Sequence, residues 1–220
     1  MTKRYLPGDE EGGDLFAWIK VKRPSMWSSF PLNPPTTLTL PGAFKSDVDK
    51  TAFRGELWAP PAYRTKVVYY SGFPIPTNGI AEDGVEELDA MLHSVTGRIT
   101  VYGHSMGAQI IYKWLREYGP TSDVPVDNVT FISAGNPERK YGGASVIDPS
   151  SYPAIYPGTG GLGVGYGLPT SPTPYVVIDV ARQYDFWADH PDDLDNDDAI
   201  TNLRGMFGNR IHGNYNNVGL

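Results

Sequence analysis

The sequence predicts an α/β fold in which a parallel sheet is flanked by helices. Short runs of β-branched and aromatic residues alternate along the chain with segments of helical periodicity. Strands that alternate with helices in this way pair in parallel through right-handed crossovers. A hydrophobic fraction of 40% in 220 residues is sufficient for one compact domain with a sizeable core.

Residues 1–60 are expected to form an irregular N-terminal extension that packs on the same domain. This part of the chain is rich in proline and has weak periodicity. Short strands are expected in it at TTLTL (36–40) and GELWA (55–59). We find no chemistry-bearing motif in this segment.

Residues 61–220 are expected to form the α/β domain. Val85, Leu88 and Leu92 recur at helical spacing and indicate its first helix. The expected strands cover 65–72, 98–104, 126–135 and 174–181, and the expected helices cover 80–95, 106–119 and 199–210. A Gly- and Pro-rich insert at 138–175 precedes the last of these strands. A loop of that length is usually functional or disordered, and this one could serve as a lid over a lipid groove.

The composition argues against several classes of function. The chain has 18 Lys and Arg against 25 Asp and Glu, and its net charge of −7 argues against nucleic-acid binding, which needs a basic face. Its lack of cysteine excludes disulfides and thiolate metal sites. No apolar run approaches the roughly 20 residues of a membrane helix, and residues 1–14 lack the apolar segment of a signal peptide. We therefore expect no integral membrane segment and synthesis in the cytoplasm.

Two other segments match cofactor-binding patterns only in part. Asp193–Asp197 begins like a calcium loop, but Asp198 and Arg204 occupy positions where that loop has glycine and glutamate. The run GTGGLGVGYG does not join a strand to a helix, as a phosphate-binding loop would. The chain is therefore expected to use no metal and no cofactor.

Residues 103–107, GHSMG, match the nucleophile-elbow pattern G-x-S-x-G. The motif lies between a predicted strand and a predicted helix, where the chemistry requires it. A serine in this tight turn is strained, and Gly103 and Gly107 let the neighbouring backbone pass closely. Ser105 is therefore the candidate nucleophile. The alternative is a purely structural turn in which the glycines allow close packing and Ser105 caps the helix.

An oxyanion hole is expected beside this serine. The N–H of Met106 lies at the start of the helix, where the helix dipole stabilises negative charge. A second donor is expected from the loop after the strand at 65–72, at Gly72 or Phe73.

The base and the acid must follow the serine in the order Ser, Asp or Glu, His. This order leaves His190 and His212, and we favour His212 because it follows the last predicted helix, where its ring can turn back over the sheet. Asp185 is the favoured acid, since it lies just beyond the carboxyl end of the last predicted strand. Asp179, within that strand, could instead be a paired carboxylate, and Asp189 could cap a turn.

Aromatic residues near these candidates could line a groove for an acyl chain, although half-buried packing explains them equally well. They are Tyr152, Tyr156, Tyr166, Phe186 and Trp187.

Several segments together resemble the PE-PPE α/β serine hydrolase domain of mycobacteria and its relatives, the cutinases and the lysin B esterases of mycobacteriophages. These segments are GHSMGAQIIYKWL (103–115), VTFISAGNPERKYGG (129–143), ARQYDFWADHPDD (181–193) and HGNY (212–215). The similarity covers about residues 65–215, and its most specific pieces are Gly135-Asn136-Pro137…Arg139 and Gln183-Tyr184-Asp185…Asp189. It implies a cutinase-like α/β-hydrolase fold.

The resemblance also implies a function and its residues. Ser105 would be the nucleophile, Asp185 the acid and His212 the base in hydrolysis of carboxylic esters of long or bulky acyl groups. Met106 stands where lysin B-like sequences usually have Gln, which leaves its backbone donor in place. We expect no helical PE or PPE module ahead of the domain, and the lack of cysteine rules out cutinase-type disulfides.

The resemblance leads to the hypothesis of a phage product that reaches the host envelope through a holin or on the virion. Its substrate would be the ester that joins mycolic acids to arabinogalactan, so its partner would be a lipid or mycolyl ester. A general cutinase- or lipase-like esterase is the first alternative. A catalytically inactive hydrolase fold that serves as a virion part is the second, and the oligomeric state is not predicted.

Overall fold

The computed structural model describes residues 36–43, 45–59, 64–70, 78–139, 142–147, 173–190 and 211–219. The helix expected at 199–210 and the greater part of the Gly- and Pro-rich insert lie outside the described residues.

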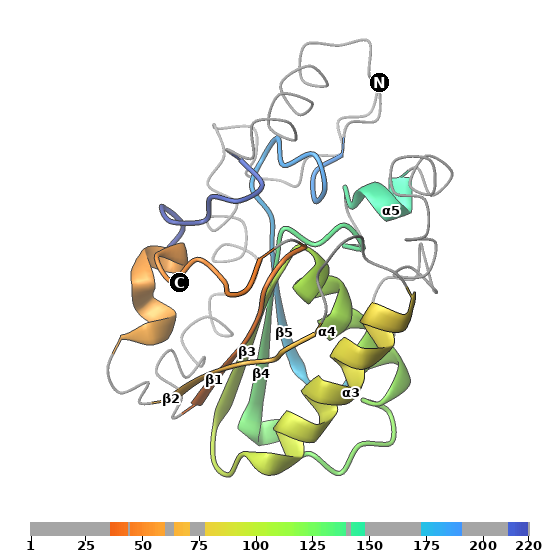
Figure 1. Cartoon of the computed structure of the whole chain (residues 1–220). Helices are drawn as coiled ribbons and strands as arrows, with labels where there is room; N and C mark the ends of the chain where they lie inside the picture. Colours follow the sequence, from red (N-terminus) through yellow and green to blue (C-terminus); the bar gives the residue numbers. More distant parts are fainter. Residues whose placement is uncertain are drawn as a thin grey trace.

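The described residues contain one five-stranded sheet in the order β2-β1-β3-β4-β5, and all of its neighbouring strands are parallel. The strands are β1 (Thr36–Leu40), β2 (Arg64–Val67), β3 (Ile99–His104), β4 (Val129–Ala134) and β5 (Val176–Val180). The helices are α3 (Asn78–Ser94), α4 (Met106–Glu117) and α5 (Ala144–Ile147), with 3-10 helices η2 (Ala52–Trp58) and η3 (Val126–Asn128). Figure 1 shows α3 and α4 together over one face of this sheet. The predicted α/β fold is confirmed.

The strand expected at TTLTL is confirmed, and it has an unexpected place. It is β1, an interior strand between β2 and β3. This part of the expected N-terminal extension therefore belongs to the sheet itself. All five residues are buried, so both faces of the strand are covered even though threonine and leucine alternate along it. Its threonines find partners inside the protein: the Thr37 hydroxyl donates to the Leu57 carbonyl at 3.2 Å.

The prediction of a strand at GELWA (55–59) is wrong, because these residues lie mostly in η2. Phe53, Arg54 and Gly55 have φ values of 52°, 55° and 76°, in the left-handed region that strands do not use. The N–H groups of Phe53 and Arg54 donate to main-chain carbonyls of the C-terminal segment 211–219 at 2.9 and 3.2 Å. These hydrogen bonds to residues far along the chain stabilise the turn, and the local sequence gives no sign of them.

Apolar residues cover both faces of the sheet, as a parallel sheet requires. Successive side chains of β3 and β4 alternate between two clusters: Val101 and Phe131 pack with α3 and α4, whereas Tyr102 and Ile132 pack on the opposite face. There the covering groups include Phe53 of η2 and residues of the C-terminal segment. The N-terminal and C-terminal parts of the described chain thus close the face that the helices leave open.

The two glycines of the GHSMG turn are required by close packing. A Cβ built on Gly103 would lie 2.6 Å from the carbonyl oxygen of Gly107, and one on Gly107 would lie 2.1 Å from the carbonyl oxygen of Leu40. Both neighbours are backbone atoms, which cannot rotate away. The start of α4 can therefore approach β1 and β3 only with glycine at these positions.

Replacing Gly107 by alanine is expected to destabilise the fold by about 3 kcal/mol or more, because the added carbon overlaps backbone. The measurement is the free energy of unfolding from urea denaturation. Gly97→Ala is the matched control: nothing lies within 4 Å of its added Cβ, but its φ of +90° still disfavours alanine. That variant should lose only about 1 to 2 kcal/mol, and equal losses in the two variants would contradict the packing argument.

Candidate active site

Ser105 lies in a strained turn between the end of β3 and the start of α4. Its φ of 56° and ψ of −117° are rare for a residue with a β-carbon and characteristic of a nucleophile elbow. The turn is held from both sides, since the Ser105 N–H donates to the Ala134 carbonyl at 2.9 Å and its carbonyl accepts from the N–H of Ala108 at 3.0 Å. The strain is thus maintained by the sheet and the helix together.

Met106 is the first residue of α4 and is buried. The first N–H groups of a helix have no partner within it, so this donor suits an anion. The other predicted oxyanion donors, Gly72 and Phe73, lie outside the described residues.

Gly42 lies beside this turn, a neighbour that the sequence analysis missed. It follows β1 by two residues, and a Cβ built on it would lie 3.1 Å from the Cβ of Ser105 and 3.2 Å from the Nδ1 of His104. In open α/β sheets, ligands bind at the carboxyl ends of strands where the strand order reverses, and here that point lies between β1 and β3. The available signal was Pro41-Gly42 directly after the run TTLTL.

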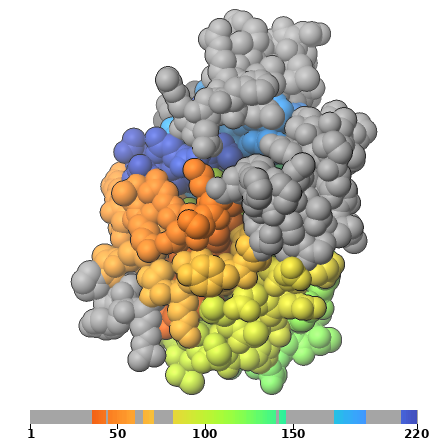
Figure 2. Space-filling view, viewed as in Figure 1, coloured from red at the N-terminus to blue at the C-terminus, as the bar shows by residue number. Residues whose placement is uncertain are grey.

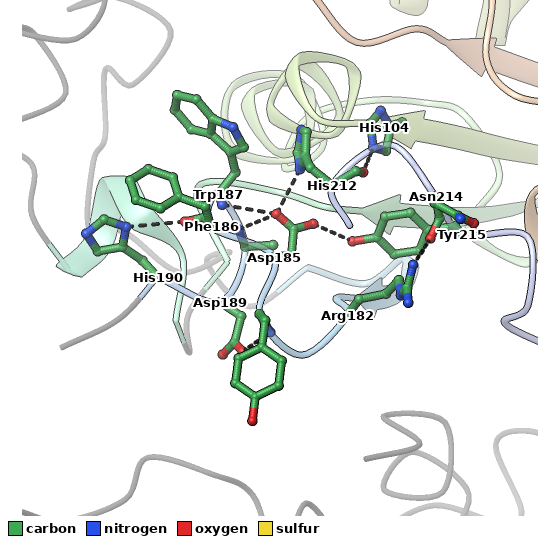
Figure 3. Close-up of polar contacts among 12 residues, drawn as sticks. His104, Arg182, Asp185, Phe186, Trp187, Asp189, His190, His212, Asn214 and Tyr215 are labelled. Atoms are coloured by element: carbon green, nitrogen blue, oxygen red, sulfur yellow. Dashed lines mark hydrogen bonds and ion pairs between the residues drawn. The ribbon is translucent and has the colours of Figure 1, made fainter. Parts of the chain in front are cut away.

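Asp185 and His212 form a buried pair. The Nδ1 of His212 lies 2.8 Å from the Oδ1 of Asp185, and Asp185 is completely inaccessible. The same Oδ1 accepts the N–H groups of Trp187 and Ala188 at 3.0 and 3.3 Å, and the Tyr215 hydroxyl donates to Oδ2 at 2.8 Å. Figure 3 shows His212 and Tyr215 converging on this one carboxylate.

These partners keep Asp185 ionised. Burial by itself raises the pKa of its carboxyl, but the charge of His212 and the hydrogen bonds from His212 and Tyr215 outweigh it and leave the pKa below its ordinary value. An ionised carboxylate only accepts hydrogen bonds, so the Nδ1 of His212 must carry a proton. In the neutral ring the Nε2 is then the basic nitrogen.

Ser105 and the Asp185–His212 pair lie close together at the carboxyl ends of the strands. The Ser105 N–H binds Ala134, and a Cβ built on the next residue, Gly135, would lie 3.2 Å from the Cε1 of His212 and 3.3 Å from the Oδ2 of Asp185. The ring of His104, which precedes Ser105, has its centroid 4.8 Å from that of His212. The structure therefore brings the three candidates together, and their catalytic roles stay predictions.

His190 has different surroundings. Its Nδ1 lies 3.2 Å from the carbonyl oxygen of Phe186, and its ring packs on the Phe186 ring. Figure 3 shows it on the far side of the Asp185 turn from His212. Of the two histidines that the sequence leaves open, His212 is the one that contacts Asp185.

The two other candidate acids have structural contacts. The Oδ2 of Asp179 accepts from the Nε of Arg139 at 3.0 Å, so it is a paired carboxylate. The Oδ2 of Asp189 accepts the Tyr184 N–H at 2.9 Å and closes a turn. Both contacts match the alternatives that the sequence analysis gave for these residues.

Trp187 is the described member of the aromatic set that stands beside the pair. Its ring centroid lies 6.2 Å from that of His212, and it is partly exposed. Phe186 is buried behind it. Tyr152, Tyr156 and Tyr166 lie outside the described residues.

Arg139 supports the turn that carries Asp185, a role the sequence analysis did not assign. Its guanidinium donates to the Ala188 carbonyl through Nη1 and to Asp179 through Nε, both at 3.0 Å. Ala188 in turn donates its N–H to Asp185. The Gly135…Arg139 segment, which the family resemblance singles out, thus connects β4 to the acid turn through a buried hydrogen bond and to β5 through a partly buried ion pair.

His104 is expected to make the fold sensitive to mild acid. Burial, assisted by the nearby charge of His212, lowers the pKa of His104 to about 4, whereas an unfolded histidine titrates near 6.5. Between these values the unfolded chain takes up a proton that the folded state refuses, so stability falls as the pH drops, by at most about 3 kcal/mol. Urea unfolding at pH 7, 5.5 and 4.5 measures this slope.

The His104→Gln variant lacks the titrating group, so its free energy of unfolding should fall less steeply as the pH drops. Asp185 and the other titrating groups contribute to the pH dependence of both proteins. Equal slopes for the wild type and this variant would contradict the assignment.

The described residues show neither a metal-binding cluster nor a membrane-spanning helix. Among the described residues, no three His, Asp or Glu side chains are grouped so that they could hold a metal ion. The helices of that same part of the chain include none with the length and apolar character needed to cross a membrane.

Comparison with known proteins identifies the family. Among solved structures, a cutinase-like protein from Cryptococcus sp. is 17% identical with a TM-score of 0.48, covering 81% of this chain and 95% of that one. A candidate thioesterase from Silicibacter sp. TM1040 is 14% identical with a TM-score of 0.40, covering 78% of this chain and 64% of that one. Both similarities are too distant to carry an argument, and no curated protein matches the sequence. The family model of the PE-PPE domain, however, matches residues 73–218, about two thirds of the sequence, and the chain therefore belongs to the PE-PPE domain family.

Proposed function

We propose that this protein is a serine esterase that hydrolyses carboxylic esters through an acyl-enzyme. The observation that carries the proposal is that the strained Ser105 turn lies at the same end of the sheet, the carboxyl ends of its strands, as the buried Asp185–His212 pair. A hydroxyl exposed by an elbow becomes a nucleophile when an imidazole takes its proton. Membership of the PE-PPE domain family supports the same class of reaction.

In the proposed mechanism the Nε2 of His212 accepts the proton of Ser105 while the serine oxygen attacks the ester carbonyl carbon. The Met106 N–H, with a second donor expected at Gly72 or Phe73, binds the oxyanion that forms. His212 then gives its proton to the alcohol oxygen as the carbon–oxygen bond breaks, which leaves an acyl group on Ser105. Water repeats these steps and releases the acid. Asp185 stabilises the imidazolium and holds its orientation.

The substrate class is an ester of a long or bulky acyl group, as in a general cutinase- or lipase-like esterase of PE-PPE type. Trp187 beside His212 supplies an apolar wall for such a group. A narrower proposal, the lysin B-like hydrolysis of mycolylarabinogalactan by a phage product at the host envelope, rests on the sequence resemblance alone. Hydrolysis rates for p-nitrophenyl esters of increasing chain length, with assays for free mycolate from purified cell walls, distinguish the two.

Covalent labelling tests the chemistry without a known substrate. A fluorophosphonate reacts far faster with an activated serine than with an ordinary hydroxyl, so the folded protein should rapidly gain one phosphonyl group, and peptide mapping should locate it on Ser105. Heat-unfolded protein and the Ser105→Ala variant serve as controls and should stay unlabelled. A folded wild-type protein that resists labelling would favour the alternative of an inactive virion part.

A further inference from the structure

The catalytic candidate His212 belongs to a C-terminal segment, residues 211–219, that the rest of the protein holds by its main chain. Figure 2 shows this segment side by side with the η2 region at the surface. Donors outside the segment bind four of its carbonyls: His104 binds that of His212, Arg182 that of Asn214, Phe53 that of Tyr215 and Arg54 that of Asn216. The position of His212 therefore depends on these contacts.

The contact from His104 differs from the others in its place. The Nε2 of His104 lies 2.6 Å from the carbonyl oxygen of His212 itself, so it acts directly on the residue that carries the candidate base. His104 is also the residue immediately before Ser105 and the last residue of β3. One side chain thus connects the backbone of the nucleophile turn to the backbone of the base, across 108 positions of sequence.

The chemistry of this contact determines the state of the ring. A carbonyl oxygen only accepts, so the Nε2 of His104 must be the protonated nitrogen and donate. Burial favours the neutral ring and lowers its pKa to about 4, which avoids a second positive charge beside the imidazolium that His212 becomes during the reaction. Figure 3 shows His104 directed at the His212 main chain, away from the Asp185 carboxylate.

We propose that His104 is a positioning residue of this site: its Nε2–H, bound to the His212 carbonyl, sets the distance between the candidate base and the adjacent Ser105. The inference rests on the proposed esterase function. It extends that function by giving the second residue of the G-x-S-x-G motif a task that the motif itself does not require. His104 touches no reacting atom, so it acts through His212.

A purely space-filling role is the competing explanation, since the His104 ring also packs at 5.7 Å, between centroids, on the ring of Tyr215. Two substitutions separate the explanations. His104→Phe keeps an aromatic ring of similar shape and removes the donor. His104→Gln keeps an N–H donor at nearly the same reach and removes the ring. A positioning role predicts that the glutamine variant works better, and a space-filling role predicts that the phenylalanine variant does.

The experiment measures kcat and KM for a p-nitrophenyl ester, together with the low-field proton resonance of the His212–Asp185 hydrogen bond by NMR. His104→Phe should lower kcat by about 10-fold to 100-fold with little change in KM, because a small displacement of a catalytic group has effects of that size. Its low-field resonance should broaden or disappear. His104→Gln should recover kcat to within a few-fold and retain the resonance.

His93→Phe is the matched control, because His93 is an exposed histidine of α3 that pairs with Asp123; it should behave as the wild type. Wild-type kcat in His104→Phe, or equal losses in the phenylalanine and glutamine variants, would overturn the proposal. If the wild-type protein hydrolyses no ester, the proposed function fails separately, and the low-field resonance of the three variants still tests whether His104 holds His212.

Discussion

Replacing Ser105 by alanine is expected to lower kcat for a p-nitrophenyl ester by about 10⁴-fold or more, because loss of a triad nucleophile leaves only the oxyanion donors and substrate binding. The fold should survive, since the main-chain bonds of the turn to Ala134 and Ala108 do not use the hydroxyl. The strained φ of 56° is equally accessible to alanine, which also carries a Cβ. Initial rates at saturating ester, with urea unfolding to verify the fold, measure the effect.

Ser94→Ala is the matched control for this prediction. Ser94 is an exposed residue of α3 whose hydroxyl donates only a local bond to the Met91 carbonyl at 2.9 Å, and its loss should leave kcat unchanged. KM should change little in Ser105→Ala, because the hydroxyl contributes to the transition state more than to substrate binding. Wild-type rates in a folded Ser105→Ala protein would refute the nucleophile assignment and, with it, the acyl-enzyme mechanism.

The second large effect is expected for Asp185→Asn, which should lower kcat by about 10³-fold to 10⁴-fold at neutral pH. The two backbone N–H groups at Oδ1 require an acceptor, so the amide oxygen should take that place and still accept from His212. The loss then comes from the missing negative charge beside the imidazolium. This charge matters more at a fully buried position than it would in water.

The same substitution has a measurable effect on stability. The pKa of Asp185 lies below its ordinary value in the folded protein, so its carboxylate stabilises the fold above about pH 4, the unfolded value, and this contribution is lost as the pH falls through the folded pKa. Asp185→Asn should abolish that part of the acid sensitivity. Urea unfolding between pH 7 and 3 provides the comparison with the wild type.

Asp189→Asn tests whether Asp185 has been correctly chosen among the acids of its turn. An asparagine at 189 can still accept the Tyr184 N–H through its side-chain oxygen, so the turn should persist and kcat should fall far less than in Asp185→Asn. A larger loss of kcat in Asp189→Asn than in Asp185→Asn would show that Asp185 is not the acid.

Local pattern predicted the part of the fold that lies between β3 and β4. The strand at 98–104 and the helix at 106–119 were expected from periodicity, and the structure confirms them as β3 and α4. Prediction was weaker where contacts are distant. A strand was expected at 55–59, yet the N–H groups of Phe53 and Arg54 bind carbonyls of the C-terminal segment, and the chain forms η2 there instead.

The sequence by itself determined the nucleophile turn, because its strand, glycines and helix all lie within about twenty consecutive residues, where spacing and sterics report the local structure. It also reduced the base to two histidines. Tertiary structure alone decided that His212 meets Asp185, that β1 is an interior strand and that His104 binds the His212 main chain. Those contacts join residues 27 to 108 positions apart. Such residues become neighbours only when the folded parallel sheet places the carboxyl ends of its strands side by side.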